Sequence, residues 1–239
     1  MCCFSQPIDS VSSTKIFARR SAKGRQVLVY SMDLETAADV AMVLPLPVSR
    51  KDPDDKLGFI NLEEYEDFFL DLAKGFRGRS RELSLGGLEV VEVGSFVASF
   101  VPTTADFGRL DPRFQLPPGT LEALPKVKDY GFAVFQLKPG AKTIHPMAFD
   151  FPCALEKSLF FPTLHIHDGK VHEEAEFDHV LYCQPGELSL RELVQWKESG
   201  GPASQFMKLE QAKELVDGEQ HLYRLELKGK KRNQDTLVA

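Results

Sequence analysis

The chain has little tryptophan, little cysteine and no long apolar run. It contains one Trp against eighteen Phe in 239 residues, four Cys, and no stretch of eighteen consecutive apolar residues. The last absence argues against a membrane-spanning helix, and four cysteines are too few for the disulfide framework of a small secreted domain. The first residues also lack the basic segment and apolar stretch of a secretory signal peptide. We therefore expect a cytoplasmic protein with reduced thiols and a core built largely from phenylalanine.

Positive charge is also in short supply. Lys and Arg number 29 against 35 Asp and Glu, which gives a formal net charge of −6. A negatively charged protein repels both the phosphate backbone of nucleic acid and an anionic membrane surface, so we expect neither as a partner. Hydrophobic residues (43%) and charged residues (27%) are close to the averages for globular proteins. The sequence does not identify a protein partner or a small-molecule ligand.

Most of residues 1–184 have the pattern of β-strands. Apolar and β-branched runs separated by turn-forming residues occur at 16–18, 26–32, 88–101, 131–138, 146–151, 159–167 and 180–183. The run 41–48 is also apolar, but Pro45 and Pro47 cannot donate hydrogen bonds to a sheet. This run is therefore expected at a sheet edge, or at the point where the chain leaves the sheet. Residues 1–184 are predicted to form a β-rich core domain.

Three segments carry helical signals. The first begins near Asn61 and ends near Gly75, and the others are 189–197, which opens with a capping box, and 204–216. Because the strands cluster first and the helices follow, we predict an α+β fold with a mixed or antiparallel sheet rather than alternating βαβ units. Residues 185–239 would form a helical C-terminal appendage packed on the same domain, with a basic KGKKR tail.

Three histidines surround a strong turn signal. In the segment LHIHDGKVH, the central Asp168 and Gly169 favour a type I′ β-hairpin turn. In that hairpin His165 lies opposite His172, and His167 shares their face because side chains alternate along a strand. Three imidazoles on one rigid ribbon predict a transition-metal site for Zn, Cu, Ni or Fe. Alternatively, the histidines form the solvent-facing side of a hairpin whose other side packs.

The N-terminal cysteine pair is a second candidate site. Cys2 is small enough to permit removal of Met1, which would leave a thiol beside a free α-amine, the nucleophile and base of N-terminal nucleophile amidohydrolases. Arg19 lies at a distance along the chain that resembles the substrate-binding Arg of the bile-salt-hydrolase-like branch. The residues after Arg19 depart from that branch, which has Asn-Asp there. The cysteines could instead bind a soft metal or begin a buried strand without any chemistry.

Several short motifs follow one another in a recognisable order over residues 2–164. They are CCF near the start, QVLVYSM, AMVLPLPV, the VGSF hairpin and YGFAVFQL followed by HPMAFDF and LFFPTL. This order resembles a bacterial domain-of-unknown-function family. The resemblance implies a β-rich topology. It implies no catalytic residue, because that family has no established activity. Members are usually exported, and they carry a Trp-Leu helix where this chain has TADFGRLDPRF.

The sequence thus leaves three functions open. The first is metal binding through the histidine hairpin, and the second is a cysteine-dependent amidohydrolase that uses Cys2 with Arg19 as a substrate contact. The third is a non-catalytic protein-interaction module, in which the proline-bearing run 41–48 and the Pro-rich segment 103–128 contact a protein partner.

Overall fold

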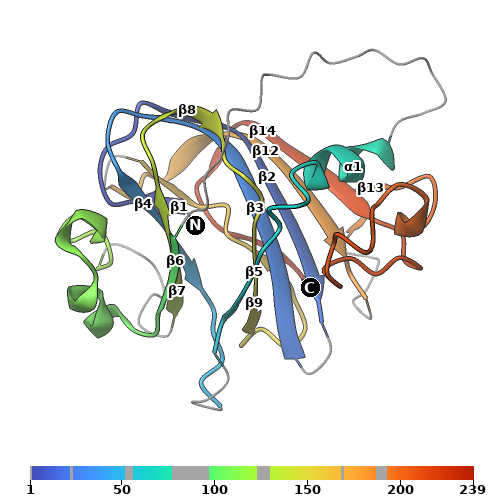
Figure 1. Ribbon diagram of the computed structural model, residues 1–239, viewed down its shortest axis with the longest axis horizontal. Helices are drawn as coiled ribbons and strands as arrows, with labels where there is room; N and C mark the ends of the chain where they lie inside the picture. The colour runs from blue at the N-terminus through green and yellow to red at the C-terminus, as the bar shows by residue number, and fades with distance from the viewer. Residues whose placement is uncertain are drawn as a thin grey trace.

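The structure, a computed structural model, describes residues 2–21, 24–51, 56–76, 97–122, 130–167, 170–186 and 193–239. Strands are the main regular structure of these residues (Figure 1): β1 (Cys2–Phe4), β2 (Ser10–Arg20), β3 (Arg25–Thr36), β4 (Val40–Leu46), β5 (Gly58–Ile60), β6 (Val97–Val101), β7 (Gly131–Leu137), β8 (Gly140–Thr143), β9 (Met147–Pro152), β10 (Leu159–Phe161), β11 (His165–Ile166), β12 (Glu174–Gln184), β13 (Lys197–Glu198), β14 (Tyr223–Arg232) and β15 (Thr236–Val238). The helical elements are α1 (Phe68–Lys74) and the 3-10 helices η2 (Thr104–Arg109), η3 (Pro112–Phe114) and η6 (Ala203–Gln205).

The strands form two large sheets and one small one. The five-stranded sheet has the order β11-β1-β4-β7-β6, and the eight-stranded sheet has the order β13-β14-β12-β2-β3-β9-β5, with β8 also paired to β3. β10 and β15 form a separate two-stranded sheet. Most neighbours are antiparallel, but β1 runs parallel to β11 and β2 runs parallel to β12. These two parallel pairs attach the N-terminal strands to segments far along the chain.

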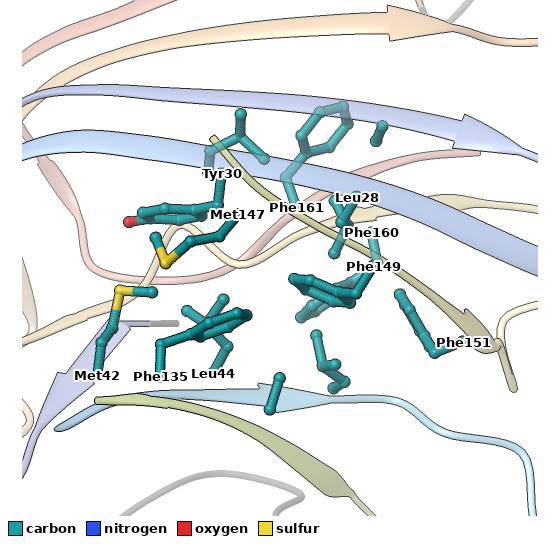
Figure 2. Packing of buried hydrophobic residues seen from close by; sticks show 14 of the residues in the cluster. Leu28, Tyr30, Met42, Leu44, Phe135, Met147, Phe149, Phe151, Phe160 and Phe161 are labelled. Atoms are coloured by element: carbon teal, nitrogen blue, oxygen red, sulfur yellow. The ribbon is translucent and has the colours of Figure 1, made fainter. Parts of the chain in front are cut away.

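A phenylalanine-rich core lies between the two large sheets (Figure 2). It forms because side chains alternate along each strand. On β3, Leu28 and Tyr30 enter this core while Val27 and Val29 point to the opposite face of the sheet. The labelled residues of the core are Leu28, Tyr30, Met42, Leu44, Phe135, Met147, Phe149, Phe151, Phe160 and Phe161.

The outer faces of both sheets are also covered. Helix α1 and residues 203–222 pack on the eight-stranded sheet through a second apolar cluster that includes Phe17 and Tyr182. Segments η2 and η3 pack on the five-stranded sheet through Phe107 and Phe114, against Phe132. Strands that are buried on both faces read as continuous apolar runs rather than as alternating ones, which is the pattern of 26–32 and 131–138.

The predicted α+β class is wrong, and so is the helical C-terminal appendage. Strands dominate the described chain, and β14, which contains the KGKKR segment, belongs to the eight-stranded sheet. In 204–216 the structure has turns after η6, because Lys213 and Glu214 adopt left-handed backbone angles with φ of 47° and 62°. The apolar spacing still buries side chains, since Ala212 and Leu215 pack on the sheet. Of 189–197, the described part is a turn followed by β13.

Two local expectations can be compared directly with the structure. Helix α1 ends at Lys74 with Gly75 as its C-cap, but it begins at Phe68, and turns rather than helix follow Asn61. Strand β4 lies between β1 and β7, and Pro45 pairs with Phe132 of β7 beyond the end of the short ladder with β1. A proline is tolerated there because no neighbour needs its missing N–H.

None of the helices in the described ranges is long and apolar enough to cross a membrane.

Candidate functional site

The two sites predicted from the sequence meet at the N-terminus of the chain. Strand β1 lies between β11 and β4, and the register of its parallel pairing places Cys2 opposite His165. The next residue, Cys3, is fully buried against the outer face of the five-stranded sheet. The side chain of Cys2 lies outside the described residues. A local reading of either segment does not reveal this parallel pair, because its two strands are far apart in the sequence.

His165 lies in a cluster of aromatic rings from β11, β12 and the segment between them. Its ring centroid is 4.6 Å from that of Phe177 and 4.6 Å from that of His179, both in edge-to-face geometry. His167 completes the group, with its Nε2 atom 3.3 Å from Nδ1 of His165 and its ring 5.8 Å from that of Phe4. The cluster joins the N-terminal strand to the eight-stranded sheet.

Burial controls the charge of this cluster. The Nε2 atom of His165 and the Nδ1 atom of His179 are buried and accept or donate no hydrogen bond within the part of the chain that the structure describes. Burial, followed by the nearby His179 and His167, lowers the pKa of His165 to about 3. Burial also lowers the pKa of His179, although Asp178 opposes that shift. Both rings are therefore neutral at physiological pH, because burial removes the solvent that would stabilise an imidazolium.

Asp178 connects the cluster to an irregular part of β2. Its carboxylate accepts a hydrogen bond from the backbone N–H of Ser13, which has a φ of 54° and lies in the register shift between Ser12 and Lys15. The nearby ring of His179, whose Nδ1 atom lies 3.7 Å from a carboxylate oxygen of Asp178, lowers the pKa of Asp178. The carboxylate is thus ionised at neutral pH and holds the bulge through a charge-assisted hydrogen bond.

His172 shares a backbone hydrogen-bond partner with His165. Its carbonyl oxygen accepts a hydrogen bond from the side-chain amide of Asn233, which also contacts the backbone of His165. The predicted turn residues Asp168 and Gly169 lie outside the described residues. Within the described ranges, β11 pairs with β1, and no group of three His, Cys, Asp or Glu side chains is placed to hold a metal ion. Metal binding by His165, His167 and His172 stays a prediction.

Arg19 is engaged in the structure of the C-terminal segment. Its guanidinium donates hydrogen bonds to the carbonyl oxygens of Leu215, at 2.9 Å, and Glu214. It projects from β2 in the eight-stranded sheet, whereas Cys2 belongs to the five-stranded sheet. Burial lowers the pKa of Arg19. The substrate contact proposed for Arg19 also stays a prediction.

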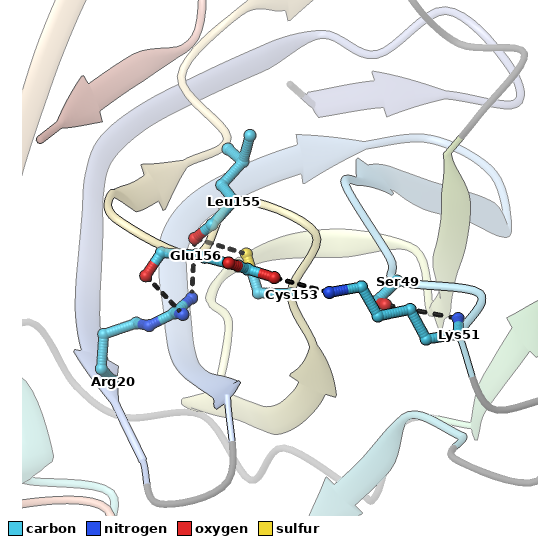
Figure 3. Close-up of polar contacts among 6 residues, drawn as sticks. All are labelled: Arg20, Ser49, Lys51, Cys153, Leu155 and Glu156. Carbon is cyan, nitrogen blue, oxygen red and sulfur yellow. Dashed lines mark hydrogen bonds and ion pairs between the residues drawn. The ribbon is translucent and has the colours of Figure 1, made fainter.

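The remaining thiols are buried rather than reactive. Cys153 is 4% exposed, and burial raises its pKa despite the nearby Arg20. Figure 3 shows Arg20 near Cys153, and its guanidinium donates hydrogen bonds of 2.9 Å to the carbonyls of Leu155 and Glu156. Burial also raises the pKa of Cys183. Because the thiolate is the nucleophilic form, neither cysteine is suited to covalent catalysis.

Sequence reasoning missed two residues of this site, His179 and Asn233. His179 follows an alternating pattern, since Phe177, His179 and Leu181 are buried while Glu176 and Asp178 are exposed. That alternation marks His179 as a buried face residue. Asn233 lies just after the basic segment 228–232 and has no local signal.

No family model matches the chain, and no curated protein matches its sequence. Its fold is similar to that in the crystal structure of baculovirus P35, with a TM-score of 0.54 and 14% identity over 96% of each chain. A mutated baculovirus P35 after caspase cleavage gives a TM-score of 0.51 at 14% identity, over 95% of this chain and 99% of that chain. A chain in the crystal structure of the caspase-8/P35 complex gives 0.50 at 13% identity over 95% of each chain. At identities this low, the structural similarity shows that the fold is shared. The resemblance to a bacterial family stays a prediction.

Proposed function

We propose that this protein is a non-catalytic inhibitor that binds a caspase. The observation that carries the proposal is the fold shared with baculovirus P35 over 96% of both chains. P35 has been crystallised in complex with caspase-8 and, as a mutant, after caspase cleavage. A fold supports many functions, so the proposal also needs support from the residues of this chain.

The described side chains fit a binding protein better than a hydrolase. The thiols of Cys153 and Cys183 are buried with raised pKa values, and Arg19 donates its hydrogen bonds to backbone carbonyls. Both large sheets have apolar segments packed on both faces. Such a scaffold is rigid, and protease inhibitors typically bind with little change of backbone. A rigid, non-catalytic scaffold is consistent with this mode of action.

The proposal is tested by measuring caspase-8 activity on a fluorogenic peptide in the presence of the purified chain. We expect caspase-8 activity to fall in proportion to the amount of chain added. We also expect the chain and caspase-8 to elute together, as a complex, from a size-exclusion column. Papain serves as a second cysteine protease and should remain active. Baculovirus P35 serves as the positive control.

A heat-unfolded sample of the same chain provides the matched control. An unfolded chain can compete as a substrate, but it lacks the folded scaffold. Inhibition by the folded sample alone supports the proposal. The proposal is wrong for caspase-8 if the folded chain leaves that enzyme fully active or is cut without reducing its activity. The same assay with a panel of other caspases then decides whether the chain inhibits any caspase.

A further inference from the structure

Strand β14 has an open edge over most of its length. It lies beside β12 along one side (Figure 1). On the other side of β14, β13 pairs with Tyr223 and Arg224. On that same side, no strand in the described ranges pairs with residues 225–232. In an antiparallel ladder, alternate residues of such an edge direct their N–H and C=O groups away from the existing neighbour. These groups are available to an additional strand.

The charges on β12 and β14 alternate in sign across the sheet. The register places Asp178 opposite Lys228, Glu176 opposite Lys230, and Glu174 opposite Arg232. All six side chains are exposed on one face. The Nζ atom of Lys230 lies 2.7 Å from a carboxylate oxygen of Glu174. Thus the strand that already adjoins β14 carries acidic residues at every second position.

The basic charge of β14 exceeds what this neighbour neutralises. Four of the five residues from Lys228 to Arg232 are cations, in a chain whose formal net charge is −6. Within the described residues, Lys231 and Arg232 form no ion pair. Positive charge is therefore concentrated along the open edge, whereas the protein as a whole is acidic.

The opposite face of the same edge is apolar at Leu225 and Leu227, and beyond them it carries Gly229 and the exposed Lys231. Leu225 and Leu227 are partly buried and pack against the core between the two sheets. A strand added beside β14 would place one set of alternate side chains near the cations and the other set near these leucines. Opposite charges on directly paired residues stabilise a sheet, and like charges destabilise it.

From this arrangement we propose that the open edge of β14 binds an extended segment of a partner protein that has acidic residues at every second position and apolar residues between them. The segment would add as a further strand, with the alternation that β12 shows in Glu174, Glu176 and Asp178. A second copy of β14 is disfavoured, because its lysines would face those of the first. This proposal does not depend on the caspase-binding function proposed above.

The experiment uses the whole chain and fluorescein-labelled synthetic peptides. The probe is a heptapeptide of alternating Val and Glu, and the uncharged control replaces each Glu with Gln. A third peptide keeps the charges but carries N-methyl groups on its three central residues, which prevents strand pairing. We expect fluorescence anisotropy to show affinity for the first peptide that is about tenfold higher than for either control, a difference of about 1.4 kcal/mol.

Protein variants test the same contact from the other side. The double substitution Lys230→Gln with Arg232→Gln should weaken binding of the acidic peptide several-fold. The matched control, Lys56→Gln with Lys138→Gln, changes two other exposed lysines and should not. Hydrogen exchange in residues 225–232 should slow when the acidic peptide is bound.

Several outcomes would overturn the proposal. They are the absence of binding by the acidic peptide, equal binding of the N-methylated peptide, and unchanged binding by the Lys230→Gln and Arg232→Gln variant. Tighter binding of a single-stranded RNA of equal charge would show that the edge attracts polyanions rather than a protein strand. Each of these results is independent of the caspase assay.

Discussion

The side-chain amide of Asn233 hydrogen-bonds both backbone groups of His165. Its Oδ1 atom accepts from the N–H of His165 at 2.8 Å, and its Nδ2 atom donates to the carbonyl of His165 at 2.9 Å. Gln26 makes the same pair of bonds with Phe160, and Gln184 makes it with Asp217. In each case a nearly or fully buried side-chain amide takes the place of a neighbouring strand and hydrogen-bonds the N–H and C=O groups of a residue far away in the sequence.

Removing the Asn233 amide should destabilise the fold. Asn233→Ala leaves the backbone groups of His165 and the carbonyl of His172 without this partner. Because a buried polar group without a hydrogen bond costs about 1–3 kcal/mol, we expect a loss of roughly 2–4 kcal/mol in the free energy of unfolding, measured by urea denaturation. Asn61→Ala is the control, since its amide bonds lie at the surface. An equal effect of both substitutions would contradict this role.

Stability should fall as the solution is acidified, partly because of His165. Its pKa is about 3 in the folded protein, below the ordinary value near 6.5. As the pH falls, the unfolded chain therefore binds a proton at this residue at a higher pH than the folded chain does. The free energy of unfolding accordingly decreases as pH falls from about 6.5 towards 3. His165→Phe keeps an aromatic ring but removes the proton. Its free energy of unfolding should depend less steeply on pH than that of the wild type, as measured by urea denaturation at several pH values.

A control separates this effect from general acid unfolding. Phe69→Leu, in the second apolar cluster, changes packing without removing a titratable group. That variant should be less stable but should retain the pH dependence of the wild type. If His165→Phe also retains it fully, His165 titrates normally and the cluster is open to solvent.

Glycine at position 214 should stabilise the protein or leave it unchanged. Glu214 has a φ of 62°, where residues other than glycine are disfavoured by about 1 kcal/mol or more. In a helix, by contrast, glycine is destabilising by roughly 1 kcal/mol relative to alanine. Thermal unfolding of Glu214→Gly and Glu214→Ala distinguishes the two conformations. A glycine variant that is less stable than the alanine variant would favour the helix that the sequence pattern predicts.

The thiols should react unequally with a disulfide reagent. Cys3, Cys153 and Cys183 are buried, so at most one thiol, that of Cys2, should react in the folded protein. All four should react in guanidinium chloride. A Cys2→Ser variant should then show no rapid reaction. Rapid reaction of two or more thiols in the wild type would show that the sheets open readily.

The amidohydrolase prediction depends on the N-terminal residue. It requires removal of Met1, because the α-amine of Cys2 would act as the base. Intact mass spectrometry of the purified chain reads this directly. A mass that includes Met1 contradicts the hydrolase and leaves the caspase proposal unaffected.

The sequence predicts the strands far better than their partners. The apolar runs at 26–32 and 131–138 mark β3 and β7, because strands buried on both faces must be continuously apolar. The pairing of Cys2 with His165 has no local signal, since parallel partners can be separated by any length of chain. The helical pattern of 204–216 fails for a related reason: burial against the sheet gives apolar residues a spacing that resembles a helix, while the backbone turns at Lys213 and Glu214.

The two parallel pairs also determine when the protein can fold during its synthesis. Strand β2 needs β12 as a neighbour, and β12 ends at Gln184. A ribosome that adds about 5–20 residues per second takes on the order of 10–40 s to reach that residue. For most of this interval the apolar residues of β2 and β3, which are made early, lack a complete sheet to cover them. The newly made chain is therefore a natural client for chaperones that shield exposed strands.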